Sequence, residues 1–75
     1  MNEEGLRRLG DDVRRRRRAL GLGQDELADL SGTSPRWIRS LEHGKSTVRL
    51  DKLAAVLDAL GLELRAELRR PGTTP

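Results

Sequence analysis

The chain has 75 residues, which is enough for one compact domain. It contains no cysteine, so a disulfide framework and a thiolate metal site are excluded, and Trp37 is its only aromatic residue. The formal net charge is +3, and all but two of the 15 basic residues are Arg.

The charge pattern alone leaves the partner open. A basic patch is typical of a nucleic-acid surface, but a run of charges along a helix is more often just a solvated face. No stretch approaches the roughly 18 apolar residues of a membrane span, and the N-terminus lacks the apolar region of a signal peptide. We therefore expect a cytoplasmic protein.

The first predicted helix runs from about residue 3 to residue 20 and ends at Gly21, a residue suited to a left-handed C-terminal cap. Its apolar residues recur at helical spacing and form one stripe. These residues are Leu6, Leu9, Val13 and Leu20. Arg17 falls in the same stripe and is predicted to turn inward, whereas its neighbours in the Arg run 14–18 can face solvent or phosphate.

Two short helices are predicted next. The first covers residues 24–31 and is stopped by Gly32. The second begins with Ser34 as N-cap and Pro35 at the first helical position, and it ends near His43. The only histidine therefore lies at a helix end, where a capping or phosphate-facing role is expected rather than catalysis.

A loop over residues 45–48 leads to a fourth predicted helix, residues 50–60, which Gly61 terminates. Its apolar face is formed by Leu50, Leu53, Val56, Leu57 and Leu60. Residues 62–68 then alternate strictly between apolar and polar, which is typical of a half-buried strand. Helix propensity argues the other way, since Leu, Glu, Arg and Ala all favour helix. We predict a strand because Gly61 breaks the preceding helix and the alternation is unbroken. Residues 69–75 have the composition of a loose tail.

Residues 24–45 carry the strongest functional signal. Two short helices joined by a tight glycine-containing turn have the apolar spacing needed to pack at a steep angle, as in a helix-turn-helix. A plain helical hairpin would explain the apolar positions equally well. It would not explain why Gln24, Arg36, Arg39 and Lys45 gather around the two helix starts and the following loop.

The segment LGLGQDELADLSGTSPRWIRSLEHGK resembles the Xre-type (Cro and phage-repressor-like) helix-turn-helix family. The resemblance covers about residues 6–61. The positions that carry it are Gln24, Leu27, Ala28, Gly32, Ser34, Ile38, Leu41, Glu42, Gly44 and Lys45. It implies a mainly α-helical domain of four to five helices that binds palindromic operator DNA as a homodimer.

The resemblance also implies roles for individual residues. Gln24 and Ser34 would fix the register on phosphate or base, and Lys45 would contact phosphate. Arg36 and Ser40 would meet base edges from the recognition helix, with Arg39 at its flank.

Two further positions concern packing. Arg17 and Glu42 would form a partly buried ion pair that orients the recognition helix. Trp37 stands where a small hydroxyl residue is common in the family, and we predict that it packs at the helix edge rather than contacting a base. The fifth helix usual in the family has contracted, since only one helix separates the loop from Gly61.

The C-terminal third, one helix followed by a short strand, is similar to the HipB-like antitoxins. In that group the strands of two subunits pair across the dimer, and a kinase-like HipA toxin is bound. The inward positions of such a strand would be Leu62, Leu64, Ala66 and Leu68.

The charges favour an antiparallel register centred on Ala66. This register sets Arg65 opposite Glu67 and Glu63 opposite Arg69 of the second copy. Centring on Arg65 would instead place Glu63 against Glu67, and like charges directly opposite are destabilising.

The sequence therefore predicts residues 1–61 as a DNA-binding domain, 62–68 as a dimerisation strand and 69–75 as a tail. We expect a nucleoid-associated repressor, most consistent with the autoregulating antitoxin of a HipBA-like pair. A stand-alone Xre-type repressor, or an interaction module with incidental DNA binding, remains open. No catalytic set, paired metal ligands or phosphate-cradling loop can be assembled, so we expect neither enzymatic activity nor a cofactor.

Overall fold

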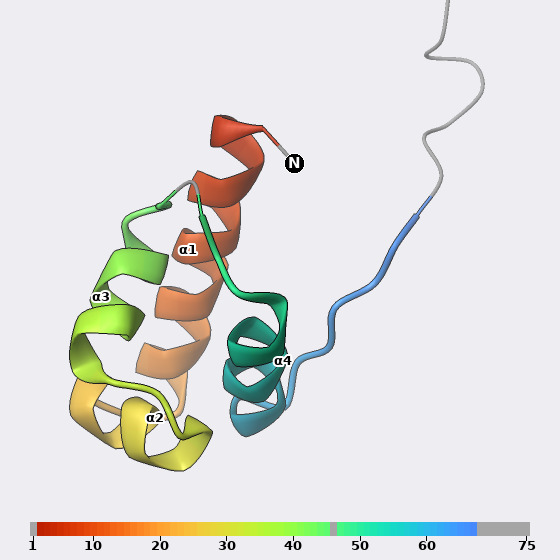
Figure 1. Cartoon of the computed structure of the whole chain (residues 1–75). Helices are drawn as coiled ribbons and strands as arrows, with labels where there is room; N and C mark the ends of the chain where they lie inside the picture. The colour runs from red at the N-terminus through yellow and green to blue at the C-terminus, as the bar shows by residue number, and fades with distance from the viewer. Residues whose placement is uncertain (1, 46, 68–75) are drawn as a thin grey trace, which may run out of the picture.

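The computed structural model of the protein describes residues 2–45 and 47–67, which form four helices (Figure 1). The helices are α1 (Glu3–Ala19), α2 (Gln24–Ser31), α3 (Pro35–Glu42) and α4 (Leu50–Ala59). Each begins and ends within one residue of its predicted position, and the mainly helical fold class is confirmed. No helix in the described part of the chain is long and apolar enough to cross a membrane.

Local capping explains where the helices begin. The Asn2 side chain accepts a hydrogen bond from the Gly5 amide at 2.8 Å and caps α1. At the start of α2 the Glu26 carboxylate accepts from the Gly23 amide, also at 2.8 Å. Each bond satisfies a backbone N–H that has no partner inside its helix. Because these contacts involve residues close in sequence, they are visible in the sequence as well.

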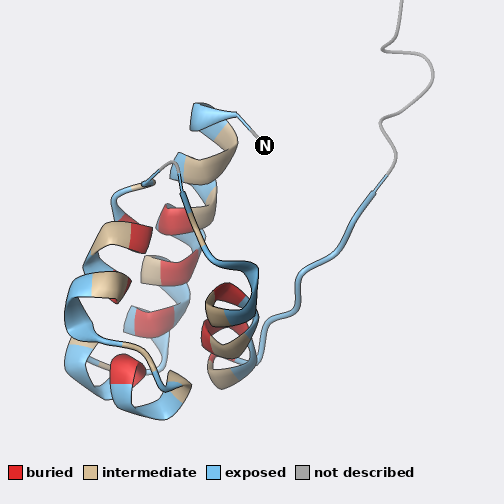
Figure 2. Cartoon of the chain, viewed as in Figure 1, coloured by how far each residue is buried: buried red, intermediate tan, exposed pale blue. Residues whose placement is uncertain are grey.

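A single apolar core holds the helices together. Every helix contributes buried side chains, and these lie on the sides that face the other helices (Figure 2). The buried apolar residues are Val13, Leu27, Ala28, Ile38, Leu41, Leu53, Val56, Leu57 and Leu60. Helix α2 packs against α3 and α4, while α1 packs against α3. Helix α3 lies at the edge of the molecule, so one side is fixed by the core and the other is left exposed (Figure 1).

Helices α1 and α3 approach each other closely at Gly10. A Cβ atom at this position would lie 2.5 Å from the Leu41 carbonyl oxygen and 2.9 Å from that of Glu42. Both neighbours are backbone atoms, so they cannot rotate away as a side chain can. The absence of a side chain at Gly10 therefore sets how closely α3 lies on α1.

Two leucines predicted on apolar faces are largely outside the core. Leu20 is 44% exposed and Leu50 is 64% exposed. Leu20 follows the last residue of α1 and Leu50 is the first residue of α4. Both lie at helix ends, where the helix surface extends past the core, so the prediction of one continuous buried face is wrong at these positions.

Residues 62–67 form no strand and lead away from the four helices (Figure 1). All six are exposed, and the Leu62 amide donates to the Leu57 carbonyl at 2.7 Å as the segment leaves α4. A strand needs a neighbouring strand for its backbone hydrogen bonds, and the described part of this one chain offers none. Pairing across a dimer therefore stays a prediction. Leu68, the last residue of the predicted strand, and the predicted tail 69–75 lie outside the described residues.

Candidate nucleic-acid interface

Helices α2 and α3 are joined by a turn of three residues. Gly32 takes a left-handed conformation with φ +69°, and its amide donates to the Ala28 carbonyl. Ser34 then caps α3, with its hydroxyl oxygen accepting from the Trp37 amide at 3.1 Å. Pro35, at the first helical position, has no N–H to leave unpaired. This local chemistry produces the sharp turn of a helix-turn-helix.

The two sides of α3 differ in chemistry. Ile38, Leu41 and Glu42 are buried, whereas Arg36 and Arg39 are exposed. Ser40 is half-buried at the border, and the first turn of α3 contains no acidic residue. The exposed side therefore presents guanidinium and hydroxyl groups, which are suited to base edges and phosphates.

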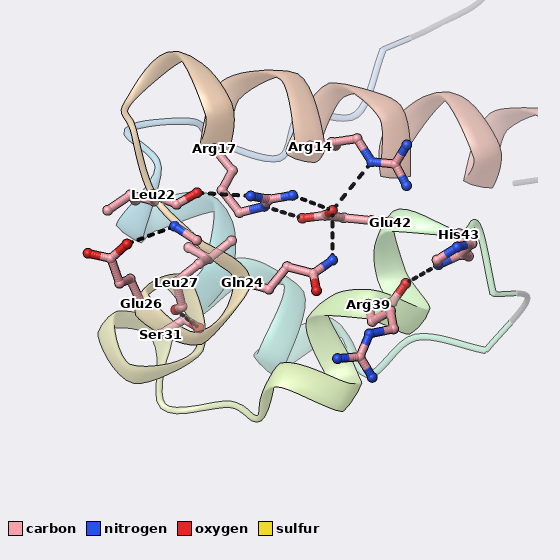
Figure 3. Close-up of polar contacts among 11 residues, drawn as sticks. Arg14, Arg17, Leu22, Gln24, Glu26, Leu27, Ser31, Arg39, Glu42 and His43 are labelled. Carbon is pink, nitrogen blue, oxygen red and sulfur yellow. Dashed lines mark hydrogen bonds and ion pairs between the residues drawn. The ribbon is translucent and has the colours of Figure 1, made fainter.

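Glu42 anchors the inner side of α3 to α1 and α2 (Figure 3). Arg17 of α1 donates from Nε to Glu42 Oε2 at 2.7 Å and from Nη2 to Oε1 at 2.9 Å. Arg14 lies with Nε 3.5 Å from Oε1, and the Gln24 amide donates to the same oxygen at 3.3 Å. The two parallel bonds from Arg17 fix orientation as well as distance. The carboxylate thus ties three helices to one point.

Burial and hydrogen bonding act on Glu42 in opposite directions. Burial alone would raise the pKa of its carboxyl group, but the hydrogen bonds from Arg17, Gln24 and Arg14, with the charge of Arg17, hold that pKa below its ordinary value. The pKa of Arg17 is raised, chiefly by its hydrogen bonds to Glu42. Both groups are therefore charged at neutral pH, and the pair remains intact there.

The guanidinium of Arg17 has a further partner, since its Nη1 donates to the Leu22 carbonyl at 2.9 Å. Leu22 lies between α1 and α2, so Arg17 also fixes the connection between those helices. Only 7% of Arg17 and 2% of Glu42 are exposed. With these bonds the buried charges are paired and hydrogen-bonded, which a buried ion pair requires.

Among the residues expected to contact DNA, Gln24 has a second function. It is the first residue of α2, and its side-chain amide donates to Glu42. Ser34 similarly uses its hydroxyl oxygen as the cap of α3. A hydroxyl that accepts one bond can still donate its own hydrogen, so the capping bond is compatible with a phosphate contact. Lys45 is exposed just beyond the end of α3.

Sequence reasoning missed two arginines that the structure places in the fold. Arg14 contacts Glu42, and Arg16 donates from Nε to the Leu60 carbonyl at 2.9 Å, which joins α1 to the end of α4. Both belong to the Arg run that was expected to face solvent or phosphate. The spacing held a signal for Arg14, because residues three apart share a helix face and Arg17 was already expected inside.

Trp37 and His43 lie at opposite ends of α3. Trp37 is partly buried and packs against the core, which agrees with the packing part of the prediction, and Lys52 Nζ lies 5.9 Å from its ring centroid. His43 is the C-cap residue, and its Nδ1 lies 2.7 Å from the Arg39 carbonyl oxygen. Since a carbonyl only accepts, the ring nitrogen donates, and the Arg39 carbonyl oxygen receives this bond in addition to the one from the His43 backbone amide at 3.1 Å.

Comparison with known proteins agrees with this geometry. Residues 8–70 match the family model described as a helix-turn-helix domain. The chain is 39% identical over 64 residues to y4mF of Sinorhizobium fredii, an uncharacterized HTH-type transcriptional regulator, and the match covers 85% of this chain and 82% of the relative.

A solved structure gives the same result at the level of the fold. The crystal structure of the restriction-modification controller protein C.AhdI from Aeromonas hydrophila matches with a TM-score of 0.74 and 33% sequence identity. The match covers 80% of this chain and 91% of the controller protein. The turn between α2 and α3, the exposed basic side of α3 and these relatives lead to one conclusion: the chain belongs to the Xre-type helix-turn-helix family of transcriptional regulators.

Proposed function

We propose that the protein is a sequence-specific repressor that inserts α3 into the major groove of a palindromic operator. The observation that carries this proposal is the asymmetry of α3. Its inner side is held by the bonds of Glu42 to Arg17 and Gln24, and its outer side presents Arg36 and Ser40. A rigid helix with uncommitted polar groups on one side is what base readout requires.

The proposed contacts divide into two kinds. Arg36 and Ser40 read base edges, with Arg39 beside them at the flank of the helix. Ser34 and Lys45 contact phosphates, as does Gln24 from the start of α2. Phosphate contacts set register and affinity, while base contacts set sequence preference. The phosphate contacts can therefore be tested by measuring affinity, and the base contacts by measuring sequence preference.

The working unit that we propose is a homodimer. Residues 1–61 form the DNA-binding domain, residues 62–68 pair as strands between two copies, and residues 69–75 form a tail. Two copies of α3 would then reach half-sites about one helical turn apart. The exposure of residues 62–67 on the folded domain supports this arrangement, because the backbone groups beyond the Leu62 amide can pair with a second chain.

We further propose that the protein is the autoregulating antitoxin of a HipBA-like pair, with a kinase-like toxin as partner. This proposal rests on the resemblance of the segment after the loop at residues 45–48 to HipB-like antitoxins.

A second candidate is a stand-alone regulator without a toxin, which the similarity to a restriction-modification controller protein favours. Co-expression with the product of an adjacent kinase-like reading frame discriminates them. If the protein is an antitoxin, co-expression should neutralise the toxicity of the kinase-like product. If no kinase-like reading frame lies beside the gene, the stand-alone regulator is supported.

The test of the DNA-binding function is a titration against the DNA upstream of the protein's own gene, at two salt concentrations, with random DNA of equal length as control. Phosphate contacts make both affinities fall with salt, but a base-reading protein retains a specificity ratio of roughly 10³ or more. Equal binding to both DNAs, abolished at the higher salt, would show that the basic surface is generic.

A further inference from the structure

A pocket of about 190 Å³ lies between α3 and the segment that follows it. Its apolar walls are Trp37 and Leu41 of α3 and Val48 of the segment before α4. Trp37 and Val48 are partly buried hydrophobic residues packed against the core, so these two walls are held in place. The pocket is therefore a built feature of the fold.

The other groups around the pocket place it on the proposed DNA-binding side. Arg36 and Ser40, the proposed base readers, line it from α3, and Lys45 and Thr47 line it from the segment beyond. Lys52 adds a second positive charge near the Trp37 ring. An occupant of this pocket must therefore offer an apolar group to Trp37, Leu41 and Val48 and a negative charge to the basic side chains.

We propose that the pocket receives the C5-methyl group of a thymine in each operator half-site, and that Trp37 is a specificity-determining residue. Base edges in the major groove present polar acceptors and donors with one exception, the thymine methyl group. A pocket with apolar walls at Trp37, Leu41 and Val48, set beside base-reading residues, therefore favours thymine. This inference rests on the proposed operator binding and adds to it one base and one residue.

The electrostatics of the pocket rim fit the same occupant. C5 of a pyrimidine lies at the edge of the major groove nearest to the sugar–phosphate backbone, so a phosphate accompanies the methyl group. Lys45 and Thr47 would then face that phosphate while Trp37 faces the methyl group. The volume leaves room for the methyl group and the C5–C6 edge of the base that carries it.

The experiment begins with operator duplexes selected from a random pool, in which each thymine of the half-site is replaced in turn by deoxyuridine. This exchange removes the methyl group and keeps every hydrogen-bonding group. At one position the dissociation constant is expected to rise about fourfold for each half-site, the value of one buried methyl group. Since Trp37 is the only aromatic residue, its fluorescence should respond more strongly to thymine than to deoxyuridine at that position.

Variants of the pocket complete the test. Trp37→Ala should bind the thymine and deoxyuridine duplexes equally, while Leu30→Ala, on an exposed side chain of α2, should keep the full difference. Should Trp37→Ala fail to fold, Val48→Ala removes part of another wall and should reduce the difference. The inference is overturned if specific binding is intact and no deoxyuridine exchange weakens it, or if the selected half-site contains no thymine. Loss of sequence-specific binding altogether would instead refute the proposed function.

Discussion

At the scale of single residues, Glu42 has the largest structural consequence. Its carboxylate is buried at the end of α3 and receives bonds from side chains of α1 and α2. If Arg17 lost this partner, a guanidinium would stay buried without a counter-charge, which costs more than the intact pair contributes. The same bonds set the direction in which α3 points, so stability and the presentation of Arg36 depend on one contact.

We predict that Glu42→Gln lowers the free energy of unfolding by about 3 kcal/mol, because the amide keeps the shape of the side chain but removes its charge. Urea denaturation followed by circular dichroism measures this as a lower midpoint at an unchanged slope. Asp12→Asn, which breaks an exposed ion pair with Arg15, is the matched control and should cost less than about 0.5 kcal/mol. Equal losses in both variants would refute the special role of Glu42.

The lowered pKa of Glu42 predicts how stability depends on pH. A carboxyl group whose pKa is lower in the folded than in the unfolded protein contributes stability above its ordinary pKa of 4.5, and this is lost as pH falls through the folded value. Unfolding titrations between about pH 7 and pH 3 should therefore show a steeper loss in the native protein than in Glu42→Gln. If stability depends on pH in the same way in the native protein and in Glu42→Gln, the pKa of Glu42 is the same in the folded and unfolded states.

The division between base and phosphate contacts gives a prediction for DNA binding. Arg36→Ala should lower the preference for the operator over random DNA by about 1–3 kcal/mol for each half-site, because a guanidinium contact to a base edge is lost. Lys45→Ala should weaken binding to both DNAs alike and reduce the salt slope by about 1 for each subunit bound. Fluorescence anisotropy titrations at several salt concentrations measure both quantities. A uniform loss in both variants would contradict base readout by Arg36.

At the scale of helices, Gly10 explains how closely α3 lies on α1. The prediction is that Gly10→Ala destabilises the protein by about 2 kcal/mol, although Ala favours helix by about 1 kcal/mol over Gly. The added methyl group would meet two backbone carbonyl oxygens of α3. Gly23→Ser is the control, since a Cβ there meets only the Glu26 carboxylate at 3.5 Å. Thermal unfolding of the two variants is the comparison, and a gain in stability for Gly10→Ala would contradict the close approach.

Contacts within one helix could be predicted from the sequence, whereas contacts between helices could not. Helix bounds follow from caps such as Ser34, which act between residues close in the chain. The inward turn of Arg17 follows from helical spacing. Gly10 and Arg16 could not be placed in this way, because their partners lie on other helices and spacing within one helix does not show which neighbour comes close. Leu50 was placed on an apolar helix face by periodicity but is exposed. Periodicity identifies the face of a helix that is apolar, but it does not show where along that face the core ends.

At the scale of the whole molecule, one copy of this domain offers a single α3. A single α3 of eight residues reaches only a few base edges, and specific complexes usually bury at least about 1,000 Å² of protein surface. Two linked copies double the contact and make binding depend on half-site spacing. The function that we propose therefore depends on how residues 62–68 join two chains.

The charge order of that segment makes its register testable. In the register centred on Ala66, Glu67 faces Arg65 of the partner subunit. Glu67→Arg should therefore weaken the dimer roughly fivefold through two symmetric repulsions. A register centred on Arg65 would instead set Glu67 against Glu63, and the same reversal would strengthen the dimer. Sedimentation velocity over a dilution series measures the dissociation constant.

Two further variants separate the effect of the Arg65–Glu67 pair from the effect of net charge. Arg65→Glu combined with Glu67→Arg restores opposite charges across the Ala66-centred dimer and should return the dissociation constant to that of the native protein. Asp29→Arg makes the same change in net charge at an exposed position of α2 and should leave dimerisation unaffected. If Asp29→Arg weakens the dimer as much as Glu67→Arg, general repulsion between two basic chains, rather than strand register, controls assembly.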